Sequence, residues 1–324
     1  MLPNILPLKP YLRETIWGGR GLATHYNKPL PDNIPIGESW EVSAYEDMES
    51  IVASGPLEGQ NLRDLAQTHG ADLLGQSVCD RYGTEFPMLI KLLDARQDLS
   101  IQVHPHDTYA RAENLGTYGK MEAWYILKSD NGRVAYGLKD GIDKHSFESA
   151  IKENRVGDAI RFFDVREGDV VFVPPGTVHA LCQNVMIYEV QQSSDLTFRI
   201  YDYNRPGADG KARELHIDRS LDVLNFGEHT PEPQHWTNLP GATPEHTLLA
   251  KSEHFQFERF APKNEKEHTY PTFSTLTILN GQAELNGSNE TFTAQTGDTV
   301  FITANRTVTV SPQNEVEYLI SSIP

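Results

Sequence analysis

The amino-acid sequence predicts a mainly β fold, a sandwich or barrel with a few short helices. Short apolar runs recur along the chain, and Gly, Pro and Asn residues separate them. Short strands with frequent turn residues between them are typical of all-β sandwiches and barrels. The runs that predict strands are 41–43, 87–93, 123–127, 170–173, 186–191 and 197–201.

Helical patterns are few and short. Residues 62–74 (LRDLAQTHGADLL) have apolar residues three and four positions apart, with Gly70 inside the pattern. This spacing places the apolar side chains on one face of a helix. Further short helices are expected at 108–115, 146–152 and 217–224.

An internal repeat predicts two related β units. Residues 168–181 read GDVVFVPPGTVHAL, and residues 297–310 read GDTVFITANRTVTV. In both copies a Gly-Asp pair turns the chain into an apolar strand, although such pairs are also common without duplication. His179 of the first copy aligns with Val308 of the second, so the polar group is present in one unit only.

The chain of 324 residues is long enough for two domains. A polar, proline-rich segment at 227–245 lies between the two copies of the repeat and is predicted to be a linker. We therefore expect a larger unit with helical insertions at 1–235. A smaller β unit is expected at 236–324.

Composition restricts the ligands of this protein. Hydrophobic residues make up 38% and charged residues 23% of the chain, as in soluble globular proteins, and the net charge is -17. A chain this acidic repels nucleic acid and anionic membranes, so neither is an expected partner. An anionic small molecule would need a local Lys or Arg.

Cysteine usage and the N-terminal sequence predict a cytoplasmic protein. Cys79 and Cys182 are too few for a disulfide framework and fit a reducing cytosol. The N-terminal stretch MLPNILPLKPYLRETIWGG is interrupted by prolines and has no continuous apolar run. Neither a signal peptide nor a membrane span is therefore expected.

Three short stretches carry a candidate metal site. In LSIQVHPHD, Gln102 and His104 are two residues apart, so a strand places both on one face. Glu122 lies in an apolar run, where an unpaired charge is costly, and His179 follows a Pro-Pro-Gly turn. Two imidazoles favour zinc over magnesium. Each residue alone also fits a structural role, as a solvated or core histidine or an exposed carboxylate.

These motifs together resemble a known family. GDVVFVPPGTVHAL resembles the second cupin motif, with Gln183 where that motif usually has Asn. Together, LSIQVHP, GKMEAWYIL, PPGTVHA and YEVQQSSDLTFRIYD resemble type I mannose-6-phosphate isomerases in their short bacterial form. The stretches TIWGG and GESWEVSA fit the same family. The likeness runs from about residue 17 to residue 202 and is looser in the C-terminal third.

The resemblance implies two cupin-type jelly-roll β-barrels, the second without metal. It implies a zinc-dependent enzyme that interconverts mannose 6-phosphate and fructose 6-phosphate through a cis-enediol, with one zinc per chain. The family's zinc ligands match Gln102, His104, Glu122 and His179. Arg199 matches the active-site arginine of the Ser-Ser-Asp-x-x-x-Arg motif. Many relatives have a histidine where this chain has Gly119, so any role of that histidine in proton transfer does not carry over.

Isomerisation of an aldose requires a base, a group that stabilises the oxyanion, and a clamp for the phosphate. Arg199 and Lys120 are cationic candidates for stabilising anionic oxygen. Glu189, in the apolar run MIYEV, and Asp195 are candidate acid/base groups, because burial raises the pKa of a carboxyl. Both carboxylates also fit structural roles, so the sequence leaves the base open. Lys91 lies inside an apolar strand and is expected to point into the barrel.

Other functions remain open at this point. The chain also fits a cupin isomerase for another phosphosugar, or a metal-dependent sugar-binding or regulatory cupin without turnover. Lys120, Glu189 and Arg199 have no obvious use in a protein that only binds sugar. A cupin dioxygenase usually employs a redox metal with more histidines, and the glutamine favours zinc.

Overall fold

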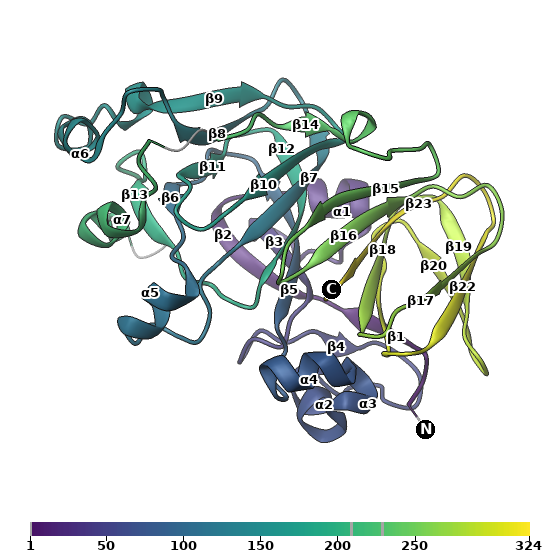
Figure 1. The fold of residues 1–324 in the computed structure, drawn as a ribbon. Coiled ribbons are helices and arrows are strands. Elements are labelled where there is room, and N and C mark those ends of the chain that lie inside the picture. The colour runs from purple at the N-terminus through teal and green to yellow at the C-terminus, as the bar shows by residue number, and fades with distance from the viewer. Residues whose placement is uncertain (1, 208–209, 228–229) are drawn as a thin grey trace.

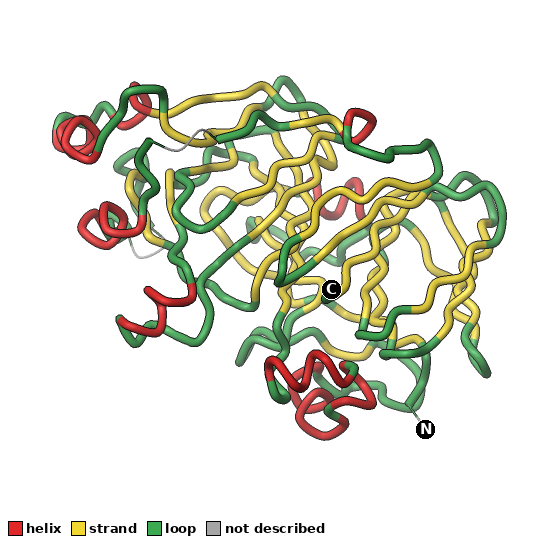
Figure 2. Tube along the Cα trace, in the orientation of Figure 1, coloured by secondary structure: helices red, strands yellow, loops and turns green. Residues whose placement is uncertain are grey.

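The computed structural model describes residues 2–207, 210–227 and 230–324. The fold is mainly β, as predicted, and its short helices lie at the periphery of the molecule (Figures 1 and 2). The strands form four antiparallel sheets, which pack as two sandwiches. Within the described residues, every helix is too short or too polar to cross a membrane.

The first sandwich is built on a seven-stranded sheet with the order β14-β10-β7-β12-β5-β3-β2. Its strands are β2 (Tyr11–Gly19), β3 (Ile36–Val42), β5 (Met88–Ala95), β7 (Glu122–Ser129), β10 (Asp169–Val173), β12 (Val185–Gln192) and β14 (Gln234–His235). The central strands β5 and β12 are buried along their whole length. This burial explains why most of their residues are apolar.

A five-stranded sheet with the order β13-β6-β11-β8-β9 faces the first sheet. Its strands are β6 (Ile101–Val103), β8 (Arg133–Leu138), β9 (Ile160–Asp164), β11 (His179–Leu181) and β13 (Phe198–Tyr201). Apolar side chains of both sheets form one core cluster, which includes Trp124, Tyr136 and Ile187. Helices α5 (Asp107–Ala112), α6 (Lys144–Lys152) and α7 (Ile217–Val223) pack on the outer face of this second sheet (Figure 1).

The second sandwich contains the C-terminal residues. Its larger sheet has the order β15-β16-β23-β18-β21-β1-β4, and its smaller sheet the order β17-β22-β19-β20. The larger sheet consists of β1 (Ile5–Lys9), β4 (Ile51–Val52), β15 (His246–Lys251), β16 (Gln256–Phe260), β18 (Ser274–Asn280), β21 (Thr299–Ile302) and β23 (Glu317–Ser322). The smaller consists of β17 (Lys266–Thr269), β19 (Gln282–Asn286), β20 (Thr291–Gln295) and β22 (Thr307–Pro312).

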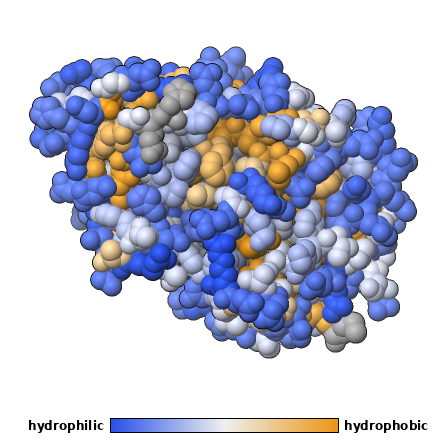
Figure 3. Space-filling model, viewed as in Figure 1, coloured by the Kyte–Doolittle hydropathy of each residue, from blue (hydrophilic) through white to orange (hydrophobic). Residues whose placement is uncertain are grey.

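The two sandwiches pack against each other through the outer faces of their larger sheets. Tyr188 of β12 stacks on Phe257 of β16, with ring centroids 6.2 Å apart, and shares a 2.8 Å hydrogen bond with Ser321. These residues belong to one apolar cluster that spans both sandwiches. Figure 3 shows a mostly polar face, with apolar side chains at the junction of the two halves and in a second patch on the left side of the view.

The N-terminal strand crosses to the second sandwich. β1 pairs antiparallel with β21, where Leu6 is opposite Phe301, and with β4. Part of the predicted linker 227–245 belongs to the first sandwich. Its strand β14 pairs with β10, and a 3-10 turn (Trp236–Asn238) follows. Residues 228 and 229 of that segment lie outside the described residues. The division into 1–235 and 236–324 stays a prediction, and β1 lies in the sheet of the later residues.

The predicted helices form close to their expected positions. The helix expected at 62–74 is two helices, α2 (Leu62–His69) and α3 (Ala71–Leu74), because Gly70 adopts φ 47° and interrupts the hydrogen-bonding pattern. Asn61 caps α2 by accepting a hydrogen bond from the backbone N–H of Asp64. Two further short helices, α1 (Gly21–Tyr26) and α4 (Gln76–Tyr82), were not expected from the sequence.

Strand register supports the internal repeat. In the first sandwich, His179 of β11 lies opposite Gln102 of β6. In the second, the aligned residue Val308 of β22 lies opposite His268 of β17. The two repeat copies therefore occupy equivalent strands in the two sandwiches, and the second sandwich has a valine where the first has His179.

Candidate metal centre and active site

Three side chains of ligand type converge between the two sheets of the first sandwich. His104 follows β6, Glu122 begins β7 and His179 begins β11. The two Nε2 atoms of the histidines are 3.1 Å apart. Nε2 of His179 lies 3.2 Å from one carboxylate oxygen of Glu122, and Nε2 of His104 lies 3.4 Å from the other. All three residues are buried, and they form a candidate metal site.

Backbone carbonyls orient both imidazole rings. Nδ1 of His104 lies 2.7 Å from the carbonyl oxygen of Leu196, and Nδ1 of His179 lies 2.8 Å from that of Thr177. A carbonyl only accepts, so each Nδ1–H donates, and each Nε2 presents a lone pair to the common point. Burial lowers the pKa of His104 to about 3 and also lowers the pKa of His179, so both rings are neutral near pH 7.

The donor set fits a divalent transition-metal ion. Two nitrogen lone pairs and a carboxylate so close together repel one another unless a cation lies between them. Both carboxylate oxygens of Glu122 lack a hydrogen-bond donor among the described residues, although Nζ of Lys120 forms an ion pair 2.8 Å from one of them. Two imidazoles and a carboxylate are typical zinc ligands.

Gln102 lies beside this group and lines a cavity above it. Its amide nitrogen is 3.4 Å from Nε2 of His179, and the hydroxyl of Ser100 is 3.4 Å from its amide oxygen. Rotating the amide by half a turn would present its oxygen to the common point as a fourth donor.

Lys120 and Glu189 lie next to the candidate metal ligands. Nζ of Lys120 is 3.8 Å from Glu189, whose other carboxylate oxygen accepts a 3.1 Å hydrogen bond from the indole N–H of Trp124. Burial of Lys120 opposes its charge, but Glu122 and Glu189 outweigh this effect and raise its pKa. Lys120 therefore stays a cation.

The carboxyl of Glu189 is suited to exchanging protons near neutral pH. Burial, reinforced by the neighbouring charge of Glu122, raises its pKa to about 7. A general acid or base works best when its pKa lies near the operating pH. This buried environment is the one expected for Glu189 from its place in the apolar run MIYEV.

The shifted pKa of Glu189 predicts a pH-dependent stability of the metal-free protein. In the folded chain the pKa is about 7, against an ordinary value of 4.5, so between these values the folded state binds the proton more tightly. The contribution of this group to the free energy of unfolding should therefore fall as pH rises through that window. Glu189→Gln should remove the fall and be more stable than the wild type at pH 8, as measured by urea unfolding with chelator present.

The exposed carboxylate Glu167 provides a control for this prediction. Glu167→Gln should change stability by a similar small amount at pH 5 and pH 8. If the difference in stability between the wild type and Glu189→Gln is the same at both pH values, the raised pKa of Glu189 is wrong.

Two further charged residues extend the network. Nζ of Lys91 lies 3.3 Å from Glu38 and 3.8 Å from Glu189, and 4.6 Å from the centre of the Trp40 ring. Burial opposes ionisation of Glu38, but Lys91 and Arg13 together lower its pKa. Lys91 points inward as predicted, whereas Glu38 was missed. The sequence feature that could have identified it is an ionisable residue within the strand sequence GESWEV, because a carboxylate in a buried strand needs a charged or hydrogen-bonding partner.

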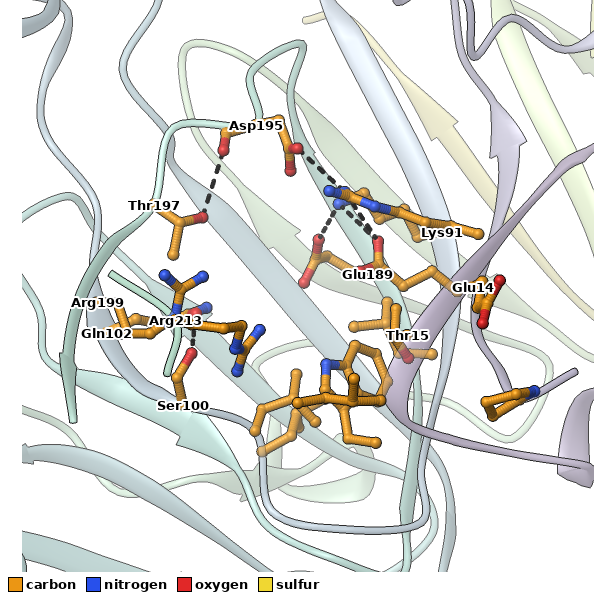
Figure 4. A pocket seen from close by; sticks show the side chains of 18 of the residues that line it. Glu14, Thr15, Lys91, Ser100, Gln102, Glu189, Asp195, Thr197, Arg199 and Arg213 are labelled. Atoms are coloured by element: carbon orange, nitrogen blue, oxygen red, sulfur yellow. Dashed lines mark hydrogen bonds and ion pairs between the residues drawn. The ribbon is translucent and has the colours of Figure 1, made fainter. Parts of the chain in front are cut away.

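A cavity of 730 Å³ opens above the candidate metal ligands. Figure 4 shows Lys91 and Glu189 on one side of it, and Arg199, Arg213, Ser100 and Gln102 gathered on another. Cavities of this volume are typical of small-molecule sites. His104, Glu122 and His179 lie beneath this cavity, outside its lining.

Asp195 lines the cavity as part of an ion pair. One of its carboxylate oxygens accepts a 3.0 Å hydrogen bond from Arg13 of β2. Arg13 also lies 3.9 Å from Glu38 and 5.3 Å from the centre of the Trp40 ring. Asp195 is therefore brought to the same cavity as the other candidate catalytic residues, where it forms an ion pair with Arg13.

Arg199 lines the cavity and has no carboxylate partner among the described residues. Its Nη1 donates a 2.8 Å hydrogen bond to the backbone carbonyl of Glu214. Among the described residues, no carboxylate lies within ion-pair distance of Arg199, because Asp202 is engaged by Arg205 and Arg213. Burial, with the nearby charge of Arg213, lowers the pKa of Arg199.

Gly119 cannot be replaced by a histidine in this backbone. A Cβ atom at this position would lie 2.3 Å from the carbonyl oxygen of Pro105 and 2.7 Å from the backbone nitrogen of Asp107. Both are backbone atoms at the start of α5, which cannot move aside cheaply. Any group that exchanges protons in this cavity must therefore come from another position.

Comparisons with known proteins identify several similar proteins. The family model "Phosphomannose isomerase type I, catalytic domain" matches residues 5–139. The probable mannose-6-phosphate isomerase GmuF of Bacillus subtilis is 33% identical over 86% of each chain. The mannose-6-phosphate isomerase of Streptococcus mutans is 33% identical over 90% of each chain. The crystal structure of the Bacillus subtilis mannose 6-phosphate isomerase superposes with a TM-score of 0.89, at 29% identity, over 99% of this chain and all of that chain.

Proposed function

Because the chain belongs to the type I mannose-6-phosphate isomerase family, we propose that it interconverts mannose 6-phosphate and fructose 6-phosphate with a bound zinc ion. The observation that carries the proposal is the buried group of two neutral imidazoles and one carboxylate directly beneath a cavity lined with Lys and Arg. In a protein with a net charge of -17, such a cavity accounts for an anionic substrate.

Four residues are proposed to hold the zinc: Gln102, His104, Glu122 and His179. The lone pairs of both Nε2 atoms point to one position, and Glu122 supplies the negative charge. A neutral glutamine as the fourth ligand leaves the ion more Lewis-acidic than a second carboxylate would. When bound, the metal polarises the sugar carbonyl or holds the hydroxyl oxygens in place.

Glu189 is proposed as the group that moves the proton. The carboxylate takes the proton from C2 while the carbonyl oxygen at C1 gains one, which gives a cis-enediol. Returning a proton to C1 while the hydroxyl at C2 loses its own gives the ketose. Support comes from the pKa of Glu189 near 7 and from its position on the cavity wall. Asp195, held by Arg13, is assigned to shaping the cavity.

Lys120 and Arg199 are proposed to stabilise negative charge on the reacting oxygens. Lys120 stays protonated and lies between Glu122 and Glu189, and Arg199 is permanently charged. Cations placed in a desolvated cavity stabilise a developing oxyanion more strongly than they would in water.

A coupled assay tests this function directly. Mannose 6-phosphate should be converted to fructose 6-phosphate, faster than glucose 6-phosphate or free mannose are turned over, and the activity should disappear with chelator and return with zinc. Binding of sugar without turnover would favour the regulatory alternative. A preference for another sugar phosphate would favour a different isomerase.

We also predict one zinc ion per chain, in the first sandwich only. By strand register, Ser274 in the second sandwich takes the place of Glu122, since Ile302 lies opposite Ser274 as Val173 lies opposite Glu122. Val308 takes the place of His179. Elemental analysis should find close to one metal per chain. Two tightly bound zinc ions would contradict this assignment.

The cellular location is proposed to be the cytoplasm. Cys79 and Cys182 are both free thiols in the structure. Free thiols persist in a reducing compartment.

A further inference from the structure

Arginines gather around one carboxylate on the wall of the cavity. Arg199 and Arg213 both line the cavity, next to Ser100 and Gln102 (Figure 4). Arg213 lies near enough to oppose the charge of Arg199, so the two guanidinium groups share one region of the wall. Two cations held together in this way favour the binding of an anion between or beside them.

Asp202 fixes the orientation of Arg213. Its two carboxylate oxygens accept hydrogen bonds of 2.7 Å from Nε and 2.6 Å from Nη2 of Arg213. Arg205 donates a third hydrogen bond, also of 2.6 Å, to the same carboxylate. The side chain of Asp202 is 4% exposed, whereas that of Arg213 is 25% exposed and faces the cavity. A bidentate pair of this kind removes most of the rotational freedom of the guanidinium group.

Among the described residues, three guanidinium groups, those of Arg199, Arg205 and Arg213, accompany the buried carboxylate of Asp202. These four groups together carry two net positive charges. The carboxylate of Glu214 is also near, but its side chain is 83% exposed and solvent screens its charge. A phosphate monoester near neutral pH carries close to two negative charges.

We propose that Arg213 binds the phosphate group of the substrate and thereby sets the preference of this enzyme for a phosphorylated sugar. This inference rests on the proposed isomerase function and assigns different roles to the two arginines. Arg199 of β13 lies opposite the candidate ligand Gln102 of β6 in the sheet. It therefore stabilises charge at C1 and C2, the reacting end of the sugar. Arg213 comes from the segment after β13, is anchored by Asp202, and holds the phosphate end of the sugar.

The test compares Arg213→Ala with the wild-type holoenzyme. KM for mannose 6-phosphate should rise about 10- to 100-fold, since hydrogen bonds to a charged group are lost, whereas kcat should change little. The ratio of kcat/KM for mannose 6-phosphate to that for free mannose should fall by a similar factor, because free mannose has no phosphate to hold. Inhibition by inorganic phosphate should weaken in parallel.

Arg155→Ala is the matched control, since it removes the same charge from an exposed arginine that pairs with Glu153 and Asp158. It should leave KM and phosphate inhibition unchanged. If Arg213→Ala does not fold, Arg213→Gln keeps most of the volume and provides the same comparison. Unchanged KM and unchanged phosphate inhibition in a folded variant would overturn the proposal.

The outcome for Arg213 is separable from that for the proposed function. If the wild type does not isomerise mannose 6-phosphate, the proposed function fails, but calorimetric binding of inorganic phosphate still tests Arg213. Phosphate binding that is lost in Arg213→Ala and kept in Arg155→Ala then supports the phosphate site. Absence of phosphate binding to the wild type overturns it.

Discussion

His104→Ala and His179→Ala should each lose zinc and activity together. Each substitution removes one of two neutral imidazoles whose Nε2 atoms lie 3.1 Å apart beside Glu122. Loss of a residue that merely orients a ligand typically lowers metal affinity about 10- to 100-fold, so removal of a ligand should cost more than about 100-fold. Metal content after dialysis and turnover of mannose 6-phosphate, measured on the same preparation, check this prediction.

His268→Ala is a demanding control for the loss of metal. His268 is also buried, and its Nε2 shares a 2.8 Å hydrogen bond with the hydroxyl of Tyr318. Its strand position in the second sandwich matches that of Gln102 in the first. The substitution should lower stability but leave the zinc content near one per chain. If His104→Ala keeps a full complement of zinc, the proposed ligand set is wrong.

Arg199→Lys should keep the fold and the zinc but lose turnover. Arg199 has no carboxylate partner among the described residues, so a lysine removes no ion pair that the fold needs. Lysine keeps the charge but cannot donate two parallel hydrogen bonds to a developing anionic oxygen. Loss of a donor that stabilises a transition state typically lowers kcat about 10²- to 10³-fold.

The kinetic pattern of Arg199→Lys separates it from the Arg213 variants. A fall in kcat with little change in KM is expected for Arg199, whereas a rise in KM is expected for Arg213. Metal content and thermal unfolding serve as controls for the fold. A rise in KM alone for Arg199→Lys would assign Arg199 to uniform substrate binding. Wild-type turnover by a folded, zinc-loaded variant would exclude a catalytic role.

Much of the candidate site could be read from the sequence because its determinants are local. Gln102 and His104 are two residues apart, and a strand places such residues on one face whatever the rest of the fold does. The turn before His179 is set by its own Pro-Pro-Gly residues. The mainly β architecture also followed from the short apolar runs and turn residues, because strand length and turn chemistry are properties of short segments.

The tertiary structure alone decided which distant groups meet. Glu38, Lys91 and Glu189 lie on three strands, and their contact depends on the order β12-β5-β3 and on the register in which Lys91 lies opposite both Trp40 and Glu189. A change of one residue in that register would turn each side chain to the opposite face. Spacing along the chain contains no information about register between strands that are many residues apart.

The arginine cluster and the path of the N-terminus show the same limit. Arg213 reaches the cavity because the buried carboxylate of Asp202 holds it there, and neither residue stands out in a local pattern. β1 leaves its sequence neighbours to pair with β21, almost 300 residues later, because that edge offers unpaired backbone groups and an apolar face. Local sequence thus determined the strands, turns and ligand types of this protein, and long-range strand pairing determined which of them form the site.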